Sequence, residues 1–306
     1  MRPLTVFTLI LTGCGGTSDR PELVWGRQGI VVGDLLRPRA VAIARDDRLY
    51  IVDFTARIQV YDRDGGYLGP TWQTPDYRKG RPSGLGIDRE GNLLVGDSHY
   101  HCVRTYSPEG RELRVLGGRP GSAPGELGYV SDVVQTPDGT YYVAEFGENQ
   151  RISVFSVDGV FVRTWGREGT EPGQFSRIRA LALGPDGLLY AADACNHRVQ
   201  VFDLDGTVRR VIGGPGSGRG ELSYPFDLGF TPEGHLVVLE QGNHRVQLFS
   251  REGRSLGLSG GPGRGPGQYH NPWAMAIDSQ GAVHVLDTDN HRIQRIRLRP
   301  DSGAGP

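Results

Sequence analysis

The residues best suited to chemistry in this chain lie in short segments that recur along it. Asn-His-Arg occurs at residues 196–198, 243–245 and 290–292, and a related segment reads His-Tyr-His-Cys at residues 99–102. Imidazole and thiolate groups are good ligands of transition metals. The segments therefore raise two possibilities, a metal centre or a surface that contacts a ligand, and the fold that positions them decides between the two.

Each of these segments follows an acidic residue that ends an apolar, β-rich run. The acidic residues recur every 44 to 48 residues, at Asp53, Asp97, Glu145, Asp193, Glu240 and Asp287. Self-similarity at this period is typical of propellers and solenoids. Within each period, a Gly-Pro-rich linker and several Gly-containing turns separate four short apolar runs, and no helical periodicity occurs. We therefore predict an all-β, six-bladed β-propeller.

The two ends of the chain hold complementary parts of one period. RIQRIRLRP at residues 292–300 supplies a third strand with no fourth strand after it, whereas ELVWGRQG at residues 22–29 matches the fourth-strand sequence FVRTWGREG at residues 161–169. We predict that the N-terminal strand pairs with the C-terminal blade and closes the propeller over residues 22–299. Closure of this kind leaves no long free sheet edge.

The third strand of each period resembles a known family. NHRVQVF at residues 196–202, NHRVQLF at 243–249 and NHRIQRI at 290–296 resemble the NHL repeat. Blade one lacks the Asn-His pair, blade two has Cys102 where Arg is usual, and blade three has one extra residue before Arg151. The resemblance implies an NHL-repeat propeller with six blades.

A ring relates equivalent turns by rotation, so the His residues of the three Asn-His-Arg segments should spread around it and not share a metal. The Arg after each His is expected to pair with a nearby acid and stabilise its loop. His99 and His101 would point to one side of an extended chain, but no further metal ligands are evident, which favours a contact loop that includes Tyr100. Cys102 and Cys195 fall in blades that are not neighbours, so no disulfide is expected.

The linkers and the loops between second and third strands should share one face of the ring, here called the top face. The candidate ligand contacts at the starts of the six inner strands are Arg39, Ser83, Ser131, Arg179, Phe226 and Trp273. Two guanidinium groups beside an aromatic wall suit an anionic or glycan-like ligand, through bidentate pairing and stacking. The alternative is that both Arg residues pair with Asp132, Asp227 or linker carbonyls and plug the channel.

The same positions bear on catalysis. The chain is similar in architecture to the peptidyl-hydroxyglycine amidating lyase, a six-bladed propeller that binds zinc through His residues at the starts of inner strands. Those positions hold Arg, Ser, Phe and Trp here, whereas zinc needs three or four N, S or O ligands. A calcium site like that of gluconolactonase-like propellers needs several converging oxygens, and Asp132 and Asp227 supply only two carboxylates. We predict no cofactor, no metal and no catalytic residue.

The N-terminus has features of an export signal. Arg2 precedes an apolar run at residues 4–11, which is too short to span a bilayer and is typical of a signal peptide. The following Leu-Thr-Gly-Cys at residues 11–14 resembles the lipobox of bacterial lipoproteins. The resemblance implies a signal peptide at 1–13, an acylated Cys14 and a tether at 14–21, and we predict a disordered tail at 300–306.

The charge balance limits the choice of partners. Lys and Arg total 34 and Asp and Glu total 35, and this net charge of −1 gives no broad footprint for nucleic acid. We expect a monomeric lipoprotein of the bacterial cell envelope, exposed to the periplasm or the exterior. Its propeller is expected to be a non-enzymatic scaffold that binds a protein, peptide or glycan on the top face. The alternative is an exported hydrolase or lyase with a channel-bound divalent metal.

Overall fold

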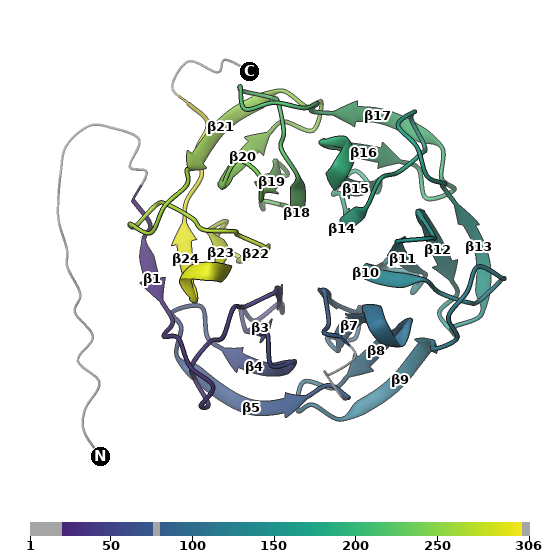
Figure 1. The fold of residues 1–306 in the computed structure, drawn as a ribbon, viewed down its shortest axis with the longest axis horizontal. Coiled ribbons are helices and arrows are strands. Elements are labelled where there is room, and N and C mark those ends of the chain that lie inside the picture. Colours follow the sequence, from purple (N-terminus) through teal and green to yellow (C-terminus); the bar gives the residue numbers. More distant parts are fainter. Residues whose placement is uncertain (1–19, 76–79, 302–306) are drawn as a thin grey trace.

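The computed structural model describes residues 20–75 and 80–301, which form a ring of six four-stranded antiparallel sheets (Figure 1). In five sheets the strands follow chain order from the central channel to the rim, and in the sixth the strands from the channel outward are β22, β23, β24 and β1. The all-β, six-bladed propeller predicted from the sequence is confirmed. The predicted signal peptide at 1–13, Cys14 and residues 302–306 of the predicted tail lie outside the described residues.

The strands fall into four classes by their distance from the channel. The inner strands are β2 (Ala40–Ile43), β6 (Gly84–Ile87), β10 (Tyr129–Gln135), β14 (Ile178–Leu183), β18 (Pro225–Phe230) and β22 (Ala274–Ile277). The second strands are β3 (Leu49–Val52), β7 (Leu93–Asp97), β11 (Tyr141–Phe146), β15 (Leu189–Asp193), β19 (Leu236–Glu240) and β23 (Val283–Asp287). The third strands are β4 (Arg57–Tyr61), β8 (Cys102–Tyr106), β12 (Arg151–Phe155), β16 (Arg198–Phe202), β20 (Arg245–Phe249) and β24 (Arg292–Ile296). The outer strands are β5 (Tyr67–Gln73), β9 (Glu112–Gly117), β13 (Phe161–Trp165), β17 (Val208–Ile212), β21 (Ser255–Gly260) and β1 (Leu23–Trp25).

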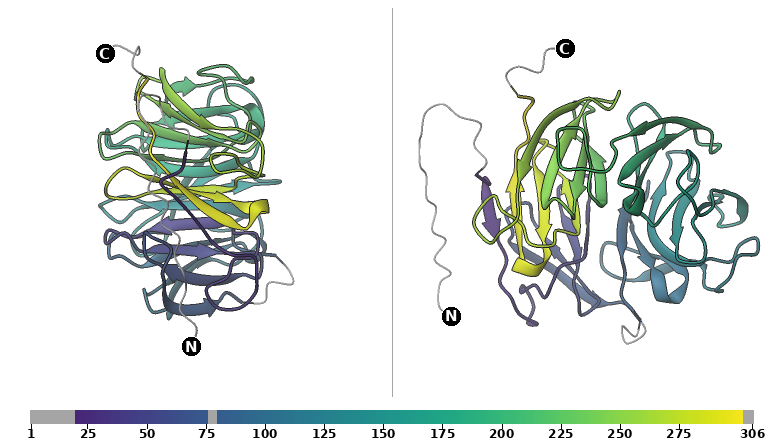
Figure 2. Two further views of the ribbon diagram at one scale, coloured as in Figure 1. Left: turned by 90° about the vertical axis from the view of Figure 1, so that its left-hand side faces the viewer. Right: turned by 45° about the horizontal axis from the view of Figure 1, so that its top comes forward.

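The chain closes the ring with its own first strand. Strand β1 pairs antiparallel with β24, with Leu23 opposite Arg295 and Trp25 opposite Ile293. The two strands lie side by side in both Figure 1 and Figure 2, although they come from opposite ends of the sequence. The ring of Trp25 also packs 5.0 Å from the ring of Tyr61 in blade one. The predicted closure is therefore confirmed, and the closing strand contacts both blades at the seam.

The core lies between neighbouring blades. Leu49 and Ile51 of blade one pack with Leu286 and Ile293 of blade six, and all four side chains are buried. Burial of each such side chain contributes about 1.5–3 kcal/mol to stability. Because each interface is formed by side chains of two neighbouring blades, every blade is held by the blades on both sides of it. Helical residues are confined to single 3₁₀ turns, η1 (Ser98–Tyr100), η2 (Ala194–Asn196) and η3 (Thr288–Asn290), and the described residues contain no helix long and apolar enough to cross a membrane.

Candidate functional site

A buried acid at the end of each second strand forms an ion pair with an Arg of the third strand. In blade four, Arg198 Nε lies 2.8 Å from Asp193 Oδ2, and the Arg198 guanidinium also donates to the carbonyls of Glu171 and Gln174 in the preceding linker. The equivalent pairs are Arg57–Asp53, Arg104–Asp97, Arg151–Glu145, Arg245–Glu240 and Arg292–Asp287. The predicted pairing is confirmed. In blade one and blades three to six, the same Arg also binds linker carbonyls and so ties the third strand to its linker.

The His residues of the Asn-His-Arg segments link each blade to the next. The Nδ1 atoms of His197, His244 and His291 accept backbone N–H groups of the following linkers, at 3.1, 3.2 and 3.0 Å. Burial lowers the pKa of His244 and His291, which favours the neutral ring that this acceptor role requires. As predicted, these residues spread around the ring. The bonds also show that the linkers and the loops between second and third strands share the top face.

The His-Tyr-His-Cys segment does not have the extended shape that we expected. Residues 98–100 form η1, and His101 follows in the left-handed conformation with φ of 53°. His99 and His101 therefore both contact the ring of Tyr129, at 5.5 and 5.4 Å between centroids, while the Tyr100 ring lies over the Arg104 guanidinium. The described residues contain no group of three or more His, Cys, Asp or Glu side chains placed to hold a metal ion. Cys102 and Cys195 form no disulfide.

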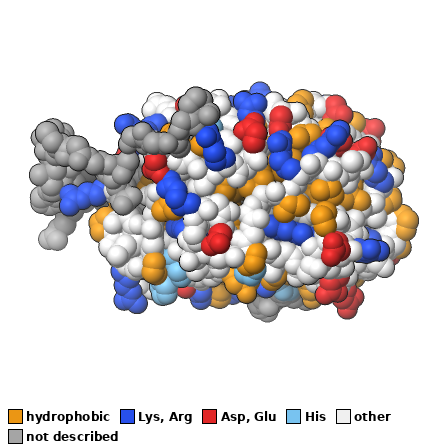
Figure 3. All heavy atoms as spheres, turned by 90° about the horizontal axis from the view of Figure 1, so that it is seen from above, with side chains coloured by type: hydrophobic (Ala, Val, Ile, Leu, Met, Phe, Trp, Pro, Cys, Tyr) orange, Lys and Arg blue, Asp and Glu red, His pale blue; other side chains and the backbone are white. Residues whose placement is uncertain are grey.

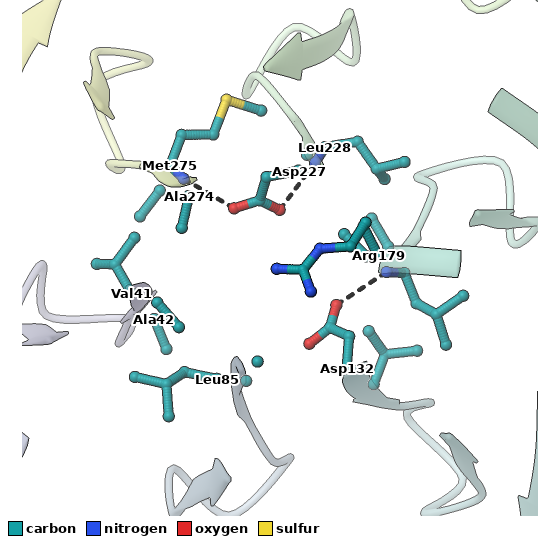
Figure 4. A pocket seen from close by; sticks show the side chains of 18 of the residues that line it. Val41, Ala42, Leu85, Asp132, Arg179, Asp227, Leu228, Ala274 and Met275 are labelled. Atoms are coloured by element: carbon teal, nitrogen blue, oxygen red, sulfur yellow. Dashed lines mark hydrogen bonds between the residues drawn. The ribbon is translucent and has the colours of Figure 1, made fainter. Parts of the chain in front are cut away.

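The inner strands of all six blades line one central cavity of about 440 Å³. Most of its lining residues are apolar in type, Val41, Leu85 and Met275 among them, but the surface that faces the cavity is polar and apolar in similar measure. Figure 4 shows Arg179 reaching toward the middle of the cavity, with Asp132 and Asp227 on either side of its guanidinium group. A concave site with a few converging polar groups among apolar side chains is the usual form of a ligand site.

Backbone irregularities at the starts of three inner strands lie beside the polar side chains. The strand pairing shifts register between Val130 and Asp132 in β10, and between Pro225 and Asp227 in β18. A third shift, between Ile178 and Leu181, includes Arg179 in β14. Bulges re-aim side chains and often occur beside functional sites. The bulged residues of blades three, four and five thus supply the charged groups of the cavity.

Four of the candidate residues meet at the top of this cavity. The Arg39 guanidinium carbon lies 4.4 Å from the centroid of the Trp273 ring, and that of Arg179 lies 4.6 Å from Phe226 and 5.7 Å from Trp273. The two aromatic rings are 6.1 Å apart and meet edge to face. We call these four residues the arginine–aromatic cluster. It joins side chains from blades one, four, five and six.

Arg179 is the buried cation of the cluster. It is 6% exposed, its Nε has no hydrogen-bond partner, and no carboxylate of the described residues lies within ion-pair distance of it. Asp132 and Asp227 instead accept the backbone N–H groups of Leu181 and Met275, at 2.8 and 2.7 Å. The alternative in which Arg179 pairs with these two carboxylates is therefore wrong. Arg39 does reach a linker carbonyl, that of Pro82, at 3.4 Å.

Burial shifts the pKa values of all these groups. It lowers the pKa of Arg39 and of Arg179 to about 10, and it raises the pKa of Asp132 to about 8 and that of Asp227 to about 7. Both carboxyl groups can therefore carry a proton near neutral pH. Under those conditions the net charge of the cavity is positive.

The remaining candidate residues are parts of the wall or lie outside it. Ser83 Oγ lies 2.8 Å from Ser98 Oγ and 2.9 Å from the carbonyl of Val130, and Ser131 is fully buried with its hydroxyl donated to the carbonyl of Ala144. Tyr100 does not line the cavity. The apolar residues that line the cavity were not identified from the sequence. The short apolar run that follows each candidate residue could have predicted them, because these runs form the inner strands.

Charged side chains elsewhere are mixed in sign. In the view of Figure 3, basic and acidic side chains are interspersed over the visible face, with hydrophobic side chains between them. That distribution is consistent with the formal net charge of −1.

Comparison with known proteins gives one family and two groups of similar proteins. The NHL repeat model matches residues 175–202 and 269–296. The peptidyl-glycine alpha-amidating monooxygenase B of Xenopus laevis is 37% identical over 89 residues, and the peptidylglycine alpha-amidating monooxygenase of Rattus norvegicus is 39% identical over 90 residues. Each match covers 28% of this chain and about a tenth of the relative, at 10% and 9%.

Solved structures match over most of the ring. A streptogramin B lyase covers 86% of this chain and 94% of its own, with a TM-score of 0.61 and 12% identity. A catalytically inactive virginiamycin B lyase from Staphylococcus aureus with quinupristin covers 87% of this chain and 85% of its own, with a TM-score of 0.58 and 15% identity. At this identity the likeness is one of fold. Together with the six sheets, it identifies the chain as a six-bladed β-propeller, in which residues 175–202 and 269–296 match the NHL repeat model.

Proposed function

We propose that this protein is a cell-envelope lipoprotein whose propeller binds an anionic group of a protein, peptide or glycan at the top of its central cavity. The observation that carries the proposal is the convergence of Arg39 and Arg179, from opposite blades, on the ring of Trp273. Two cations held beside aromatic faces form a ready-made receptor for a carboxylate, sulfate or phosphate. The acyl anchor at Cys14 and the envelope location rest on the sequence alone.

The chemistry of binding follows from the unused donors of Arg179. A guanidinium group offers five N–H donors in a fixed plane and pairs with planar anions through two parallel hydrogen bonds. Such pairs are stronger inside a protein than in water because the local dielectric constant is lower. A bound anion would satisfy the donors of Arg179, while the faces of Phe226 and Trp273 stack against the apolar part of the ligand.

Similarity to lyases supports a second candidate, an exported hydrolase or lyase with a divalent metal in the channel. Asp132 and Asp227 are the lining residues that could contribute oxygen ligands. They lie on non-adjacent blades, each already accepts backbone N–H groups, and the described residues include no third ligand beside them. The donor set does not fit a metal centre, so we favour the binding scaffold.

A capture experiment with matched variants tests the arginine–aromatic cluster. The purified protein, an Arg39→Ala/Arg179→Ala variant and an Arg254→Ala/Arg264→Ala control, which changes two exposed arginines, would be used to capture partners from envelope extract. We expect the wild type and the control to recover the same partner and the cluster variant to lose it. Equal recovery by all three proteins would contradict the site.

Two further measurements separate the remaining parts of the proposal. Labelled palmitate should enter the wild-type protein in a bacterial host and should not enter a Cys14→Ser variant. Calcium should leave the melting temperature unchanged. A calcium-dependent rise that disappears in an Asp132→Ala/Asp227→Ala variant would favour the hydrolase or lyase.

A further inference from the structure

The linker between β1 and β2 has an apolar tip that its counterparts lack. Ile30, Val31 and Val32 are 70%, 57% and 58% exposed. The same loop occurs five times, each closed by one parallel bridge, at Gln28–Leu35, Pro120–Leu127, Glu168–Phe175, Pro215–Leu222 and Pro262–Tyr269. At the equivalent positions the other four loops have Ser-Ala-Pro (122–124), Thr-Glu-Pro (170–172), Ser-Gly-Arg (217–219) and Arg-Gly-Pro (264–266).

The backbone of this loop is held rigidly. The buried guanidinium of Arg57 donates to the carbonyls of Ile30, Val31, Gly29 and Asp34. Arg198 holds the loop of blade four by the same kind of bonds. Because a polar tip is compatible with this backbone, the fold does not require Ile-Val-Val. Three adjacent exposed apolar side chains on a fixed loop instead indicate a surface that another body covers.

Two exposed arginines flank the tip in sequence, and each forms an ion pair. The side chain of Arg27 is 77% exposed and pairs with the buried Asp34. That of Arg37 is 43% exposed and pairs with Asp289. In Figure 1 the loop projects from the rim at the lower left, beyond the end of β1 that lies away from the start of the described chain. The exposed guanidinium groups beside the apolar tip can also contact the headgroups of anionic lipids.

The size and shape of the tip favour a bilayer over a protein. A stable protein interface buries about 800 Å² on each partner, far more than three side chains on a projecting loop supply. A bilayer needs no matching surface, and a short apolar loop can enter the boundary between headgroups and acyl chains. Cys14 lies six residues before Arg20, the first described residue, so an acyl group there would be within about 20 Å of the ring.

We propose that residues 30–32 insert into the interfacial region of an anionic membrane, with the rim between blades six and one against the bilayer. The proposal goes beyond ligand binding in the cavity. It shares with the proposed function only the acyl anchor at Cys14, which the test treats separately.

The test places one polarity-sensitive dye at two equivalent loops. In the full chain with Cys195→Ser, which removes the exposed thiol, the dye is attached at Val31→Cys or, as the matched control, at Ala123→Cys. Vesicles contain equal parts of phosphatidylglycerol and phosphatidylethanolamine. We expect emission from position 31 to increase several-fold, shift to the blue and be quenched by a nitroxide-labelled lipid, and emission from position 123 to stay unchanged. Equal responses at the two positions would overturn the proposal.

A loop graft and an anchor variant separate the two membrane contacts. Ile30→Ser/Val31→Ala/Val32→Pro gives this loop the sequence of its blade-three counterpart, and in a Cys14→Ser background it should lower vesicle binding at least tenfold. Unchanged vesicle binding by the graft would also overturn the proposal. If the dye at position 31 responds equally with and without Cys14, loop insertion does not depend on the anchor. Failure of the anchor would instead appear as absence of labelled palmitate from the wild-type protein. A response to envelope proteins but not to vesicles would assign the tip to a protein partner and overturn the membrane assignment.

Discussion

Two sets of arginines in this propeller have opposite environments. At the turns between second and third strands, each of the six blades pairs a buried acid with an Arg. In blade one and blades three to six, that Arg also donates to linker carbonyls. In the central cavity, Arg179 is as buried as Arg57, Arg198 and Arg245 but pairs with no acid of the described residues. The presence or absence of a carboxylate partner thus distinguishes the arginines that stabilise the fold from Arg179, whose donors are available to a ligand.

Blade two shows that the peripheral pair is required even where the motif is lost. Cys102 occupies the usual Arg position, directly opposite Asp97 in the strand pairing. Arg104, two residues later on β8, supplies the cation instead, 3.3 Å from Asp97. A buried carboxylate without a partner is costly, so a cation is provided from another position on the same strand.

The largest expected effect comes from breaking one peripheral pair. Asp193→Ala leaves the Arg198 guanidinium buried without its carboxylate, and we expect the free energy of unfolding to fall by about 3–5 kcal/mol. Urea denaturation would measure the loss. Asp205→Ala, at an exposed acid of the same blade, should change stability by less than about 0.5 kcal/mol. Equal effects of the two substitutions would erase the distinction between paired and available charges.

Substitution of the cavity arginine should impair binding and leave stability intact, the opposite of the result expected for Asp193. Arg179→Met replaces a buried cation with an apolar side chain of similar length, so we expect stability to stay unchanged or to rise by about 1 kcal/mol. Binding of the captured partner should weaken about 100-fold, or about 2.7 kcal/mol. Calorimetric unfolding and titration would measure the two quantities. A large loss of stability would place Arg179 among the arginines that build the fold.

The carboxyl groups of the cavity should give a distinct pH dependence. Burial raises the pKa of Asp132 to about 8, whereas an unfolded Asp titrates near 3.9. Between these values the folded protein holds a proton that the unfolded chain has lost, so the contribution of Asp132 to stability is full at low pH and falls as pH rises toward 8. Asp132→Asn should flatten the pH profile by up to about 1.4 kcal/mol per pH unit. An unchanged profile would mean that Asp132 is ionised throughout.

The smallest expected effect concerns the links between blades. His244→Ala removes the Nδ1 acceptor of the Asn271 N–H group, and we expect a loss of about 1 kcal/mol. Thermal unfolding of the variant would detect it. A loss as large as that of Asp193→Ala would show that these His residues support the ring as strongly as the ion pairs do.

The sequence was sufficient for the architecture because the architecture repeats. The recurring acids gave the number of blades, and the match between the two chain ends gave the closure that β1 and β24 form. The Arg–acid pairs also followed, since both partners occur within a few residues of each other in every period. Each of these conclusions depends on contacts within one period or on equivalence between periods.

The cavity was only partly predictable because its contacts cross the ring and depend on irregular backbone. The sequence identified Arg39 and Arg179 as candidates but gave no reason to expect that both would reach Trp273. It also left open whether Arg179 pairs with Asp132, which accepts a backbone N–H group instead. Bulges at the starts of the inner strands and the turn of η1 determine these directions. No periodic pattern encodes them.

Closure by the first strand also determines how the ring comes apart under load. The seam joins residues up to 275 positions apart, as in the bond that Arg297 donates to the carboxylate of Glu22. Contacts this distant form slowly, so the earliest part of the chain to be synthesised is among the last to find its place. In the finished molecule, tension applied at the N-terminus reaches β1 before any other strand, and β1 has only three residues. The strand that closes the propeller is therefore the one we expect to detach first under force.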